Sequence, residues 1–296
     1  MKHLIFFTVF LSLFGCFQNY SAPKKVKKDS ILSLEVQGII TSSVSQEFME
    51  QIRRYMKNPM IKGLLVRIDS PGGTVGASQE INEAIKEVRD LYKKPVVVSA
   101  GDIMASGGIY SAVSADQIIV NKGSLLGSIG ALMVFKNVSE LIRWAKMDIY
   151  SIKAGEFKDS GSPFREMTLR EREIFENLME DVLEQFKSAI VEGRGLDPKV
   201  VEAFTDGRVF TGEYAVQIGL ADKTGFFNEA IKVIGELTGL GSAPELFSPS
   251  KDKGLFKYLG DLDSKAVIPS SFERFLSFYR LSGKPLYIMP SYLSVR

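Results

Sequence analysis

The sequence predicts an α/β fold built on a parallel sheet, and three observations support this. Residues 63–68 and 95–100 are continuous apolar runs, short enough to be strands that are covered on both faces. Between these runs, residues 75–92 carry apolar side chains at the spacing of one helical face. The order strand, helix, strand with short breaks is typical of βαβ units, whose strands pair in parallel.

The remaining elements follow from the same periodicities. Thr168 and Glu171 form a capping box that begins a long helix, which we expect to end at Gly193 with its Glu and Arg side chains on a solvated face. The other predicted elements, in chain order, are a strand at 31–36, a helix at 46–56, a helix at 107–114, a strand at 118–120 and helices at 197–204, 212–218 and 227–237.

The first fifteen residues have the layout of an export signal. Lys2 precedes a short apolar stretch that ends near Gly15 and Cys16, and this stretch is about half the length that a membrane-spanning helix requires. We therefore predict a signal or lipoprotein leader at 1–15 and a polar, Lys-rich tether at 16–29. The end of the leader resembles a bacterial lipobox, which predicts a lipid on Cys16; a leader that is retained or ordinarily cleaved is the alternative.

Composition excludes several classes of site. The only histidine, His3, and the only cysteine, Cys16, belong to the leader region, so a Ser-His-Asp triad, a Cys-His pair and a His-ligated zinc site are excluded. The net charge of +2 owes much to the lysines of the tether and does not suggest nucleic-acid binding. No P-loop motif occurs, and we expect neither a metal nor a cofactor.

Beyond the tether, the sequence divides into two parts. Residues 30–240 contain the predicted strands and helices and form the folded domain. Residues 241–296 form a C-terminal extension that is first rich in Gly, Ser, Pro and Lys and then ends in aromatic and aliphatic residues. We expect an extended arm there, whose apolar side chains need a partner surface.

Two Gly-Gly pairs follow neighbouring predicted strands, at 72–73 and 107–108. The carboxyl ends of parallel strands are where reactive groups gather, and glycines let backbone N–H groups approach a substrate carbonyl, as an oxyanion hole requires. Ser106 directly precedes the second pair and is the candidate nucleophile. Serine needs a base, and without histidine a lysine remains; local sequence does not favour Lys158 over Lys153 or Lys122.

The choice among these three lysines is decided by a set of ordered motifs that resemble those of a known family. The motifs lie at 68–73, 104–110, 115–116, 127–130, 155–159, 161–168 and 207–222. Together they resemble the signal peptide peptidase A family of serine peptidases, in its short, single-copy form within peptidase family S49. The resemblance covers about residues 30 to 237.

The resemblance implies a crotonase-like or Clp-peptidase-like α/β core, with an additional helical segment and the C-terminal arm. It assigns roles to six residues. These are the nucleophile Ser106, the general base Lys158, the lysine-orienting Ser128, and the oxyanion-hole or substrate-binding glycines Gly72, Gly73 and Gly107.

The function implied is that of a serine endopeptidase, without a cofactor, that cleaves remnant signal peptides or other unfolded hydrophobic peptides. Family members form rings or domes in which serine and lysine come from neighbouring subunits. The implied location is the bacterial cell envelope, with the leader or its lipid at the membrane and the catalytic domain outside the cytoplasm. Two alternatives are a crotonase-like acyl-CoA hydrolase or hydratase and a catalytically silent, peptide-binding membrane scaffold.

Overall fold

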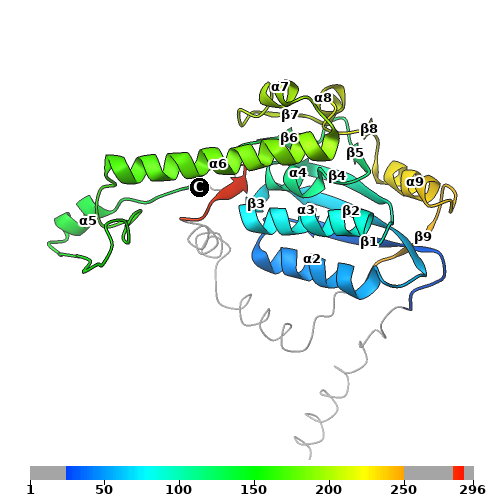
Figure 1. Cartoon of the computed structure of the whole chain (residues 1–296), viewed down its shortest axis with the longest axis horizontal. Helices are drawn as coiled ribbons and strands as arrows, with labels where there is room; N and C mark the ends of the chain where they lie inside the picture. The colour runs from blue at the N-terminus through cyan, green and yellow to red at the C-terminus, as the bar shows by residue number, and fades with distance from the viewer. Residues whose placement is uncertain (1–24, 250–282, 290–296) are drawn as a thin grey trace, which may run out of the picture.

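The computed structural model describes residues 25–249 and 283–289 (Figure 1). The predicted leader, the predicted lipid site at Cys16 and most of the tether lie outside these residues. Within the two described ranges, none of the helices combines the length and the apolar character needed to cross a membrane.

A mainly parallel sheet forms the centre of the molecule and confirms the predicted α/β fold. Its strands run in the order β7-β6-β4-β2-β1-β9, with β5 paired to β4 and to β8, and β6-β7 is the antiparallel pair. The bounds are β1 (Ser30–Gln37), β2 (Ile61–Ser70), β4 (Val96–Met104), β5 (Gln117–Val120), β6 (Leu125–Gly127), β7 (Val209–Thr211), β8 (Lys223–Thr224) and β9 (Glu245–Phe247).

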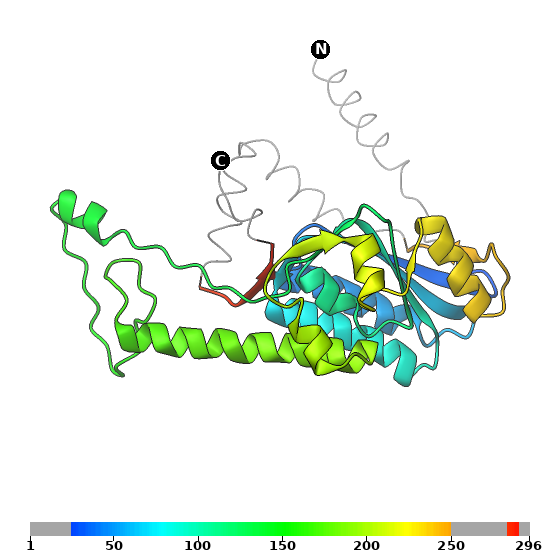
Figure 2. The same cartoon turned by 90° about the horizontal axis from the view of Figure 1, so that it is seen from above.

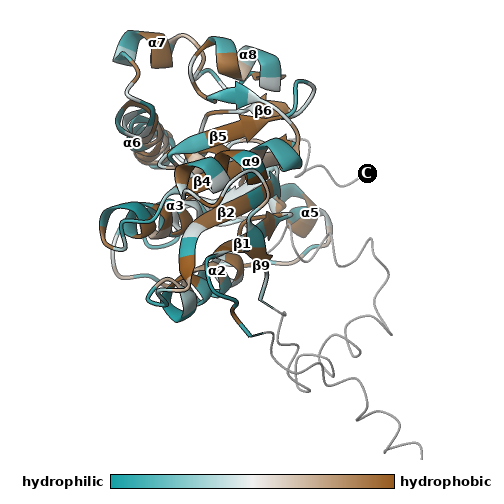
Figure 3. Ribbon diagram, turned by 90° about the vertical axis from the view of Figure 1, so that its right-hand side faces the viewer, coloured by the Kyte–Doolittle hydropathy of each residue, from teal (hydrophilic) through white to brown (hydrophobic). Residues whose placement is uncertain are grey.

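Helices cover both faces of this sheet, as the apolar runs of β2 and β4 predict. Val66 belongs to the main core with side chains of α2 (Ser42–Tyr55) and α3 (Val75–Asp90), whereas its neighbour Leu65 packs in a second core with Ile234 of α9 (Phe227–Leu237). Successive strand residues point to opposite faces, so α2 and α3 lie on one side and α9 on the other. Figure 3 shows the apolar residues concentrated on the strands between these helices.

The long helix α6 (Leu169–Arg194) begins at the predicted capping box, in which Thr168 and Glu171 bond reciprocally. It ends one residue later than expected, at Arg194, and is followed by Gly195, whose φ of 64° favours glycine. Its C-terminal half is buried through Val182 and Phe186, but Ile174 is 44% exposed. The reason is visible in Figures 1 and 2: the N-terminal half of α6 extends beyond the sheet.

The segment that precedes α6, residues 133–168, projects from the domain in the same direction. It contains α5 (Ser139–Trp144), which lies near the end of α6 that is far from the sheet in both views (Figures 1 and 2). We call residues 133–168 the projecting segment. The shorter helices on the domain itself are α4 (Gly107–Ala112), α7 (Pro198–Glu202) and α8 (Gly212–Gln217).

The C-terminal extension packs, where it is described, on the domain of its own chain. β9 pairs in parallel with β1, so the main sheet continues past the predicted boundary at residue 240. β10 (Leu286–Ile288) pairs antiparallel with β3 (Gly72–Thr74). The apolar end of the arm was expected to need a partner surface. For β10 this surface is β3, the strand that carries the first Gly-Gly pair.

Candidate active site

Ser106 lies at the junction between β4 and α4, where the chain turns sharply. Its backbone has φ 50° and ψ −116°, a conformation that a residue with a side chain rarely adopts. The residue is 1% exposed, and its Oγ is buried without a hydrogen-bond partner among the described residues. A buried hydroxyl without a partner in a strained turn is typical of a group held for reaction rather than for stability.

Two residues at the end of β2 hold this turn in place. The Asp69 carboxylate accepts a hydrogen bond from the N–H of Ile103 at 3.0 Å. The Ser70 carbonyl accepts one from the N–H of Ala105 at 3.0 Å, and the Ser70 hydroxyl accepts one from the N–H of Gly72 at 3.0 Å. The strand ends that carry the two Gly-Gly pairs are therefore fixed side by side.

The glycines predicted for the oxyanion hole converge at this point. A Cβ atom added to Gly107 would lie 3.1 Å from the backbone nitrogen of Gly73, and one added to Gly72 would lie 2.8 Å from the nitrogen of Gly107. A Cβ atom on Gly73 would lie 1.9 Å from the carbonyl oxygen of Ile40. Only glycine fits this approach, which packs the backbones of the two Gly-Gly pairs directly against each other.

Ser128 belongs to the same cluster through the end of β6. The N–H of Ser106 donates to the carbonyl of Gly127 at 2.8 Å, and Ser128 is the next residue in the chain. Ser128 is 5% exposed, has a φ of 52°, and its N–H donates to the carbonyl of Arg208 at 2.7 Å. The structure therefore brings five of the six predicted site residues together.

Lys158, the sixth, lies elsewhere. It occupies an exposed turn of the projecting segment, between α5 and α6, whereas Ser106 directly precedes α4. The part of the projecting segment between α5 and α6 lies apart from α4 in both views (Figures 1 and 2). Within the described residues, the Lys158 ammonium makes no hydrogen bond to Ser106 Oγ or to Ser128. A single chain therefore presents the nucleophile and the predicted base on separate parts of the molecule.

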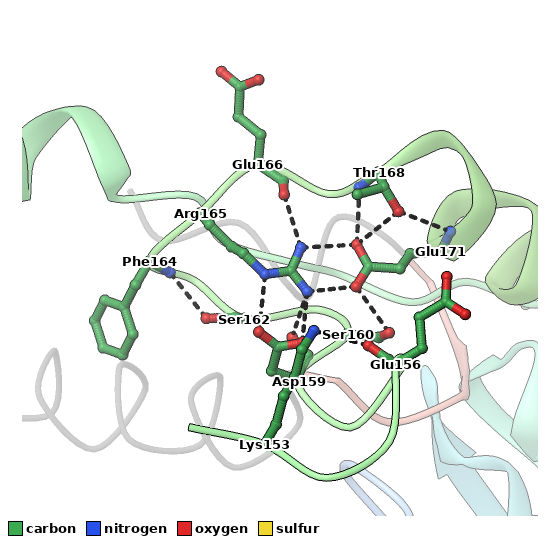
Figure 4. A network of polar contacts seen from close by, with 10 residues as sticks. All are labelled: Lys153, Glu156, Asp159, Ser160, Ser162, Phe164, Arg165, Glu166, Thr168 and Glu171. Atoms are coloured by element: carbon green, nitrogen blue, oxygen red, sulfur yellow. Dashed lines mark hydrogen bonds and ion pairs between the residues drawn. The ribbon is translucent and has the colours of Figure 1, made fainter. Parts of the chain in front are cut away.

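An ionic network fixes the turn that carries Lys158 (Figure 4). Arg165 lies at its centre and donates to the Asp159 carboxylate at 2.9 and 3.0 Å and to the Glu171 carboxylate at 2.8 Å. Lys153 also bonds Asp159. The Glu171 carboxylate accepts further hydrogen bonds from Ser160 Oγ and the Thr168 N–H. We call Asp159, Arg165 and Glu171 the loop clamp.

The expectation that the charged residues of α6 lie on a solvated face is wrong for Glu171. This side chain is 3% exposed, because it closes the capping box and also binds Arg165. Hydrogen bonds from Arg165 lower the pKa values of both Asp159 and Glu171 well below their ordinary range, and bonds to Glu171 and Asp159 raise the pKa of Arg165. Sequence reasoning identified the capping box, but nothing local showed that Arg165 would reach it.

Two further motif aspartates serve the scaffold. Asp116 accepts a hydrogen bond from the N–H of Val96 at 2.7 Å and pairs with Arg89. Asp222 accepts one from the N–H of Ile118 at 2.7 Å and pairs with the largely buried Arg194 at 2.5 Å. Both carboxylates thus hold the beginnings of strands. Within the described residues, no group of three or more His, Cys, Asp or Glu side chains is arranged to hold a metal ion.

Comparison with known proteins adds an independent finding. The model of "Peptidase family S49" matches residues 89–241. A protein of Synechocystis sp., named as a proposed protease, is 37% identical over 217 residues, which cover 73% of this chain and 77% of the relative. A protein of Enterococcus faecium, named as a proposed signal peptide peptidase SppA, is 27% identical over 212 residues, covering 68% of this chain and 61% of the relative.

A solved structure agrees with the fold. The 1510-N membrane-bound stomatin-specific protease, solved as a mutant, superposes with a TM-score of 0.51 at 16% sequence identity, over 76% of this chain and all of that chain. At this level of identity the likeness concerns the arrangement of strands and helices. It agrees with the α/β core described above.

Proposed function

The chain belongs to peptidase family S49 and is a serine-type protease, and from this premise we propose that it is a membrane-associated endopeptidase with a Ser-Lys dyad. Ser106 is the nucleophile, Lys158 the general base and Ser128 the residue that orients the lysine. The observation that carries this proposal is the buried, unpartnered Oγ of Ser106 at the point where the backbones of Gly72, Gly73 and Gly107 pack closely together.

The chemistry follows from these groups. Neutral Lys158 accepts the proton of the Ser106 hydroxyl while Oγ attacks a peptide carbonyl carbon, and the N–H groups of Gly73 and Gly107 stabilise the negative charge on the carbonyl oxygen. The protonated lysine then donates to the leaving amine, which leaves an acyl-enzyme. Water then attacks the acyl carbon while Lys158 accepts one of its protons; Ser106 Oγ leaves, takes this proton back from the lysine, and the carboxylic acid is released.

We infer that the base comes from a second copy of the chain. Support comes from the separation of Lys158 and Ser106 within one chain and from the exposure of large apolar side chains on the projecting segment, among them Trp144, Tyr150 and Ile152. The loop clamp keeps the Lys158 turn ordered while it is away from the domain. A ring or dome of copies would bring each Lys158 to the Ser106 of its neighbour.

Apolar peptides at a membrane, including remnant signal peptides, are the proposed substrates. Two names support this class: the Enterococcus faecium relative is named for signal peptide cleavage, and the structural neighbour is named as membrane-bound. The predicted leader at 1–15 and the tether at 16–29 would hold the protease at such a surface.

The dyad is tested with Ser106→Ala and Lys158→Ala in the full chain, assayed on a fluorogenic apolar peptide. Each variant is expected to lower kcat by about a thousandfold or more, because neither nucleophile nor base has a substitute. If each site draws its two residues from neighbouring copies, a 1:1 mixture that exchanges subunits regains about a quarter of wild-type activity, the fraction of sites with both residues intact.

Lys122→Ala is the matched control, because this exposed lysine pairs with Glu213 away from the cluster and should leave activity unchanged. Restoration by mixing would contradict a site within one chain. Activity retained by either single variant would contradict the dyad. Peptide binding without cleavage by the wild-type chain would instead favour a silent scaffold.

The membrane proposal has its own measurement. If Cys16 is lipidated, the intact mass of the chain purified from a bacterial envelope fraction corresponds to a mature protein that begins at Cys16 and carries lipid. Cys16→Ser should then remain unprocessed and lose the lipid mass. A wild-type chain that still contains Lys2 would reject lipidation.

A further inference from the structure

A groove runs between α3 and α6, and two polar contacts cross it. The Gln79 amide donates to the side-chain oxygen of Gln185 at 2.9 Å, and seven residues further along both helices Lys86 pairs with Glu192 at 3.7 Å. Equal spacing on the two helices means that they run in the same direction. The groove therefore follows both of them for at least two turns, about 10 Å.

The groove is strongly acidic. Its lining carries a single positively charged side chain, that of Lys86, and five carboxylates, which belong to Glu80, Glu83, Asp181, Glu184 and Glu192. A serine or lysine side chain bonds three of these carboxylates. Glu83 on α3 and Asp181 on α6 are exposed and have no ion-pair partner within the described residues. The groove thus offers negative charge from both of its walls.

The floor of the groove holds a hydrogen-bond acceptor without a donor. Asn82 lines the groove but is only 4% exposed, and its Oδ1 has no hydrogen-bond partner among the described residues. A buried polar atom without a partner is rare in a folded protein. Tyr110 lies beside it on the floor; burial raises the pKa of this phenol, and the nearby charges of Glu192 and Glu83 raise it further.

These groups define the chemistry of a ligand. Carboxylates and the Asn82 carbonyl oxygen all accept hydrogen bonds, so the ligand must supply donors and positive charge. A lysine ammonium has three donors and no acceptor, and an arginine guanidinium has five. No group of three or more His, Cys, Asp or Glu side chains in the described ranges is arranged to hold a metal ion. The carboxylates are spread along the groove, which suits a chain of spaced positive charges.

The groove reaches the candidate active site. Tyr110 on its floor belongs to α4, and the N–H of Tyr110 donates to the carbonyl of Ser106 at 3.0 Å. At the beginning of α3, a Cβ atom added to Gly107 would collide with the hydroxyl of Ser78, and the next residue, Gln79, lines the groove. A peptide in the groove would therefore need only a few extended residues, at about 3.3 Å each, to reach the nucleophile.

We propose that this groove binds the basic N-terminal region of a peptide substrate while the apolar region of the same peptide lies at Ser106. The proposal rests on the proposed function, which supplies the substrate class. Signal peptides begin with a positively charged region that is followed directly by an apolar one. The groove makes this order a means of selection: apolar peptides preceded by lysine or arginine bind more tightly than apolar peptides without them.

The experiment compares two fluorogenic peptides that share one apolar sequence and differ only in Lys-Lys-Lys or Gln-Gln-Gln before it. The full chain should show a KM about tenfold lower for the lysine peptide, since each exposed ion pair adds little but several act together. The value of kcat should be unchanged, because contacts remote from the reacting carbonyl stabilise substrate and transition state alike. High salt should reduce the difference in KM.

The double variant Glu83→Gln/Asp181→Asn should lose most of this preference without a change in KM for the glutamine peptide. Both side chains are exposed, so the substitutions leave the packing intact. Glu50→Gln/Asp90→Asn is the matched control: it removes two exposed carboxylates from α2 and α3 that do not line the groove, and it should keep the preference.

Equal KM values for the two peptides in the wild type overturn the proposal. So does a preference that the groove variant keeps, or one that the control loses to the same extent. If the wild-type chain hydrolyses neither peptide, the proposed function is contradicted separately. Fluorescence anisotropy of the two labelled peptides with the full-length Ser106→Ala chain then still decides whether the groove prefers lysine, because this measurement requires no turnover.

Discussion

Ser106 and Ser111 show how function and stability separate at the level of single residues. Both are buried serines at α4, one before its first residue and one within it. The Ser111 hydroxyl donates to the carbonyl of Gly107 at 2.8 Å, but the Ser106 hydroxyl has no partner among the described residues. A buried polar group without a hydrogen bond destabilises a fold, so the unpartnered hydroxyl supports the proposal that Ser106 serves reactivity and not stability.

Ser106→Ala should therefore raise the free energy of unfolding by about 1 kcal/mol while it abolishes activity, because the buried hydroxyl no longer lacks a partner. Ser111→Ala, the matched control on the same helix, should lower it by about 1 kcal/mol. Urea unfolding at one fixed protein concentration measures both, since assembly would otherwise contribute to the apparent stability. A Ser106→Ala chain less stable than the wild type would contradict this account.

At the scale of elements, the loop clamp joins the projecting segment to the start of α6. Asp159 and Glu171 have lowered pKa values because Arg165 donates hydrogen bonds to both. Carboxylates whose folded pKa is depressed contribute stability that is present above their unfolded pKa, near 4, and is lost as the pH falls through the folded pKa. The clamp should therefore persist in the wild type below pH 4.

Arg165→Gln should make the projecting segment sensitive to acid at a higher pH, because both carboxylates lose the largest cause of their lowered pKa values, which then rise toward the ordinary value of about 4. Trp144, the only tryptophan of the chain, lies on this segment, so its fluorescence anisotropy reports the order of the segment.

Arg170→Gln is the control for this titration, since Arg170 pairs with Glu156 in a bond exposed to solvent and should contribute little. If the anisotropy of the Arg165→Gln chain followed the wild-type pH curve, the clamp would not be what orders the segment.

At the scale of the whole molecule, the outer part of the projecting segment, around α5, lies far from the sheet (Figure 2) and exposes large apolar side chains. Ile152 is 95% exposed, and Trp144 and Tyr150 are each 82% exposed. Three large apolar side chains exposed within nine residues of one segment are typical of an interaction site. A second copy of the chain is the partner that the proposed function requires, because Ser106 needs a Lys158 that its own chain holds elsewhere.

Ile152→Ser should weaken assembly and reduce activity in parallel, with the loss of activity growing as the protein is diluted. Sedimentation velocity and peptide hydrolysis over the same concentration range measure the two effects. Phe226→Ser is the control, because Phe226 is 78% exposed just before α9 and outside the projecting segment. If the Ile152→Ser chain assembled fully but had reduced activity, this side chain would not belong to the contact between subunits.

Much of the fold could be predicted from sequence, because its signals are local. The apolar runs of β2 and β4 indicated strands covered on both faces, and Thr168 with Glu171 marked the start of α6. The order of these elements is enough to predict a parallel sheet. The cluster around Ser106 followed as well, since two Gly-Gly pairs at the ends of neighbouring parallel strands must meet at one edge.

Sequence by itself thus determined the α/β core, the candidate nucleophile and the glycines beside it, because each depends on periodicity or turn chemistry within a few residues. Only the tertiary structure decided that Glu171 is buried against Arg165, that Lys158 stands apart from Ser106, and that Tyr287 stacks on Tyr110. These depend on how segments far apart in the chain approach one another; Tyr287 and Val182, for example, bond across 105 positions. No local pattern encodes such an approach, because it is set by the packing of whole elements and by the direction in which the projecting segment leaves the sheet.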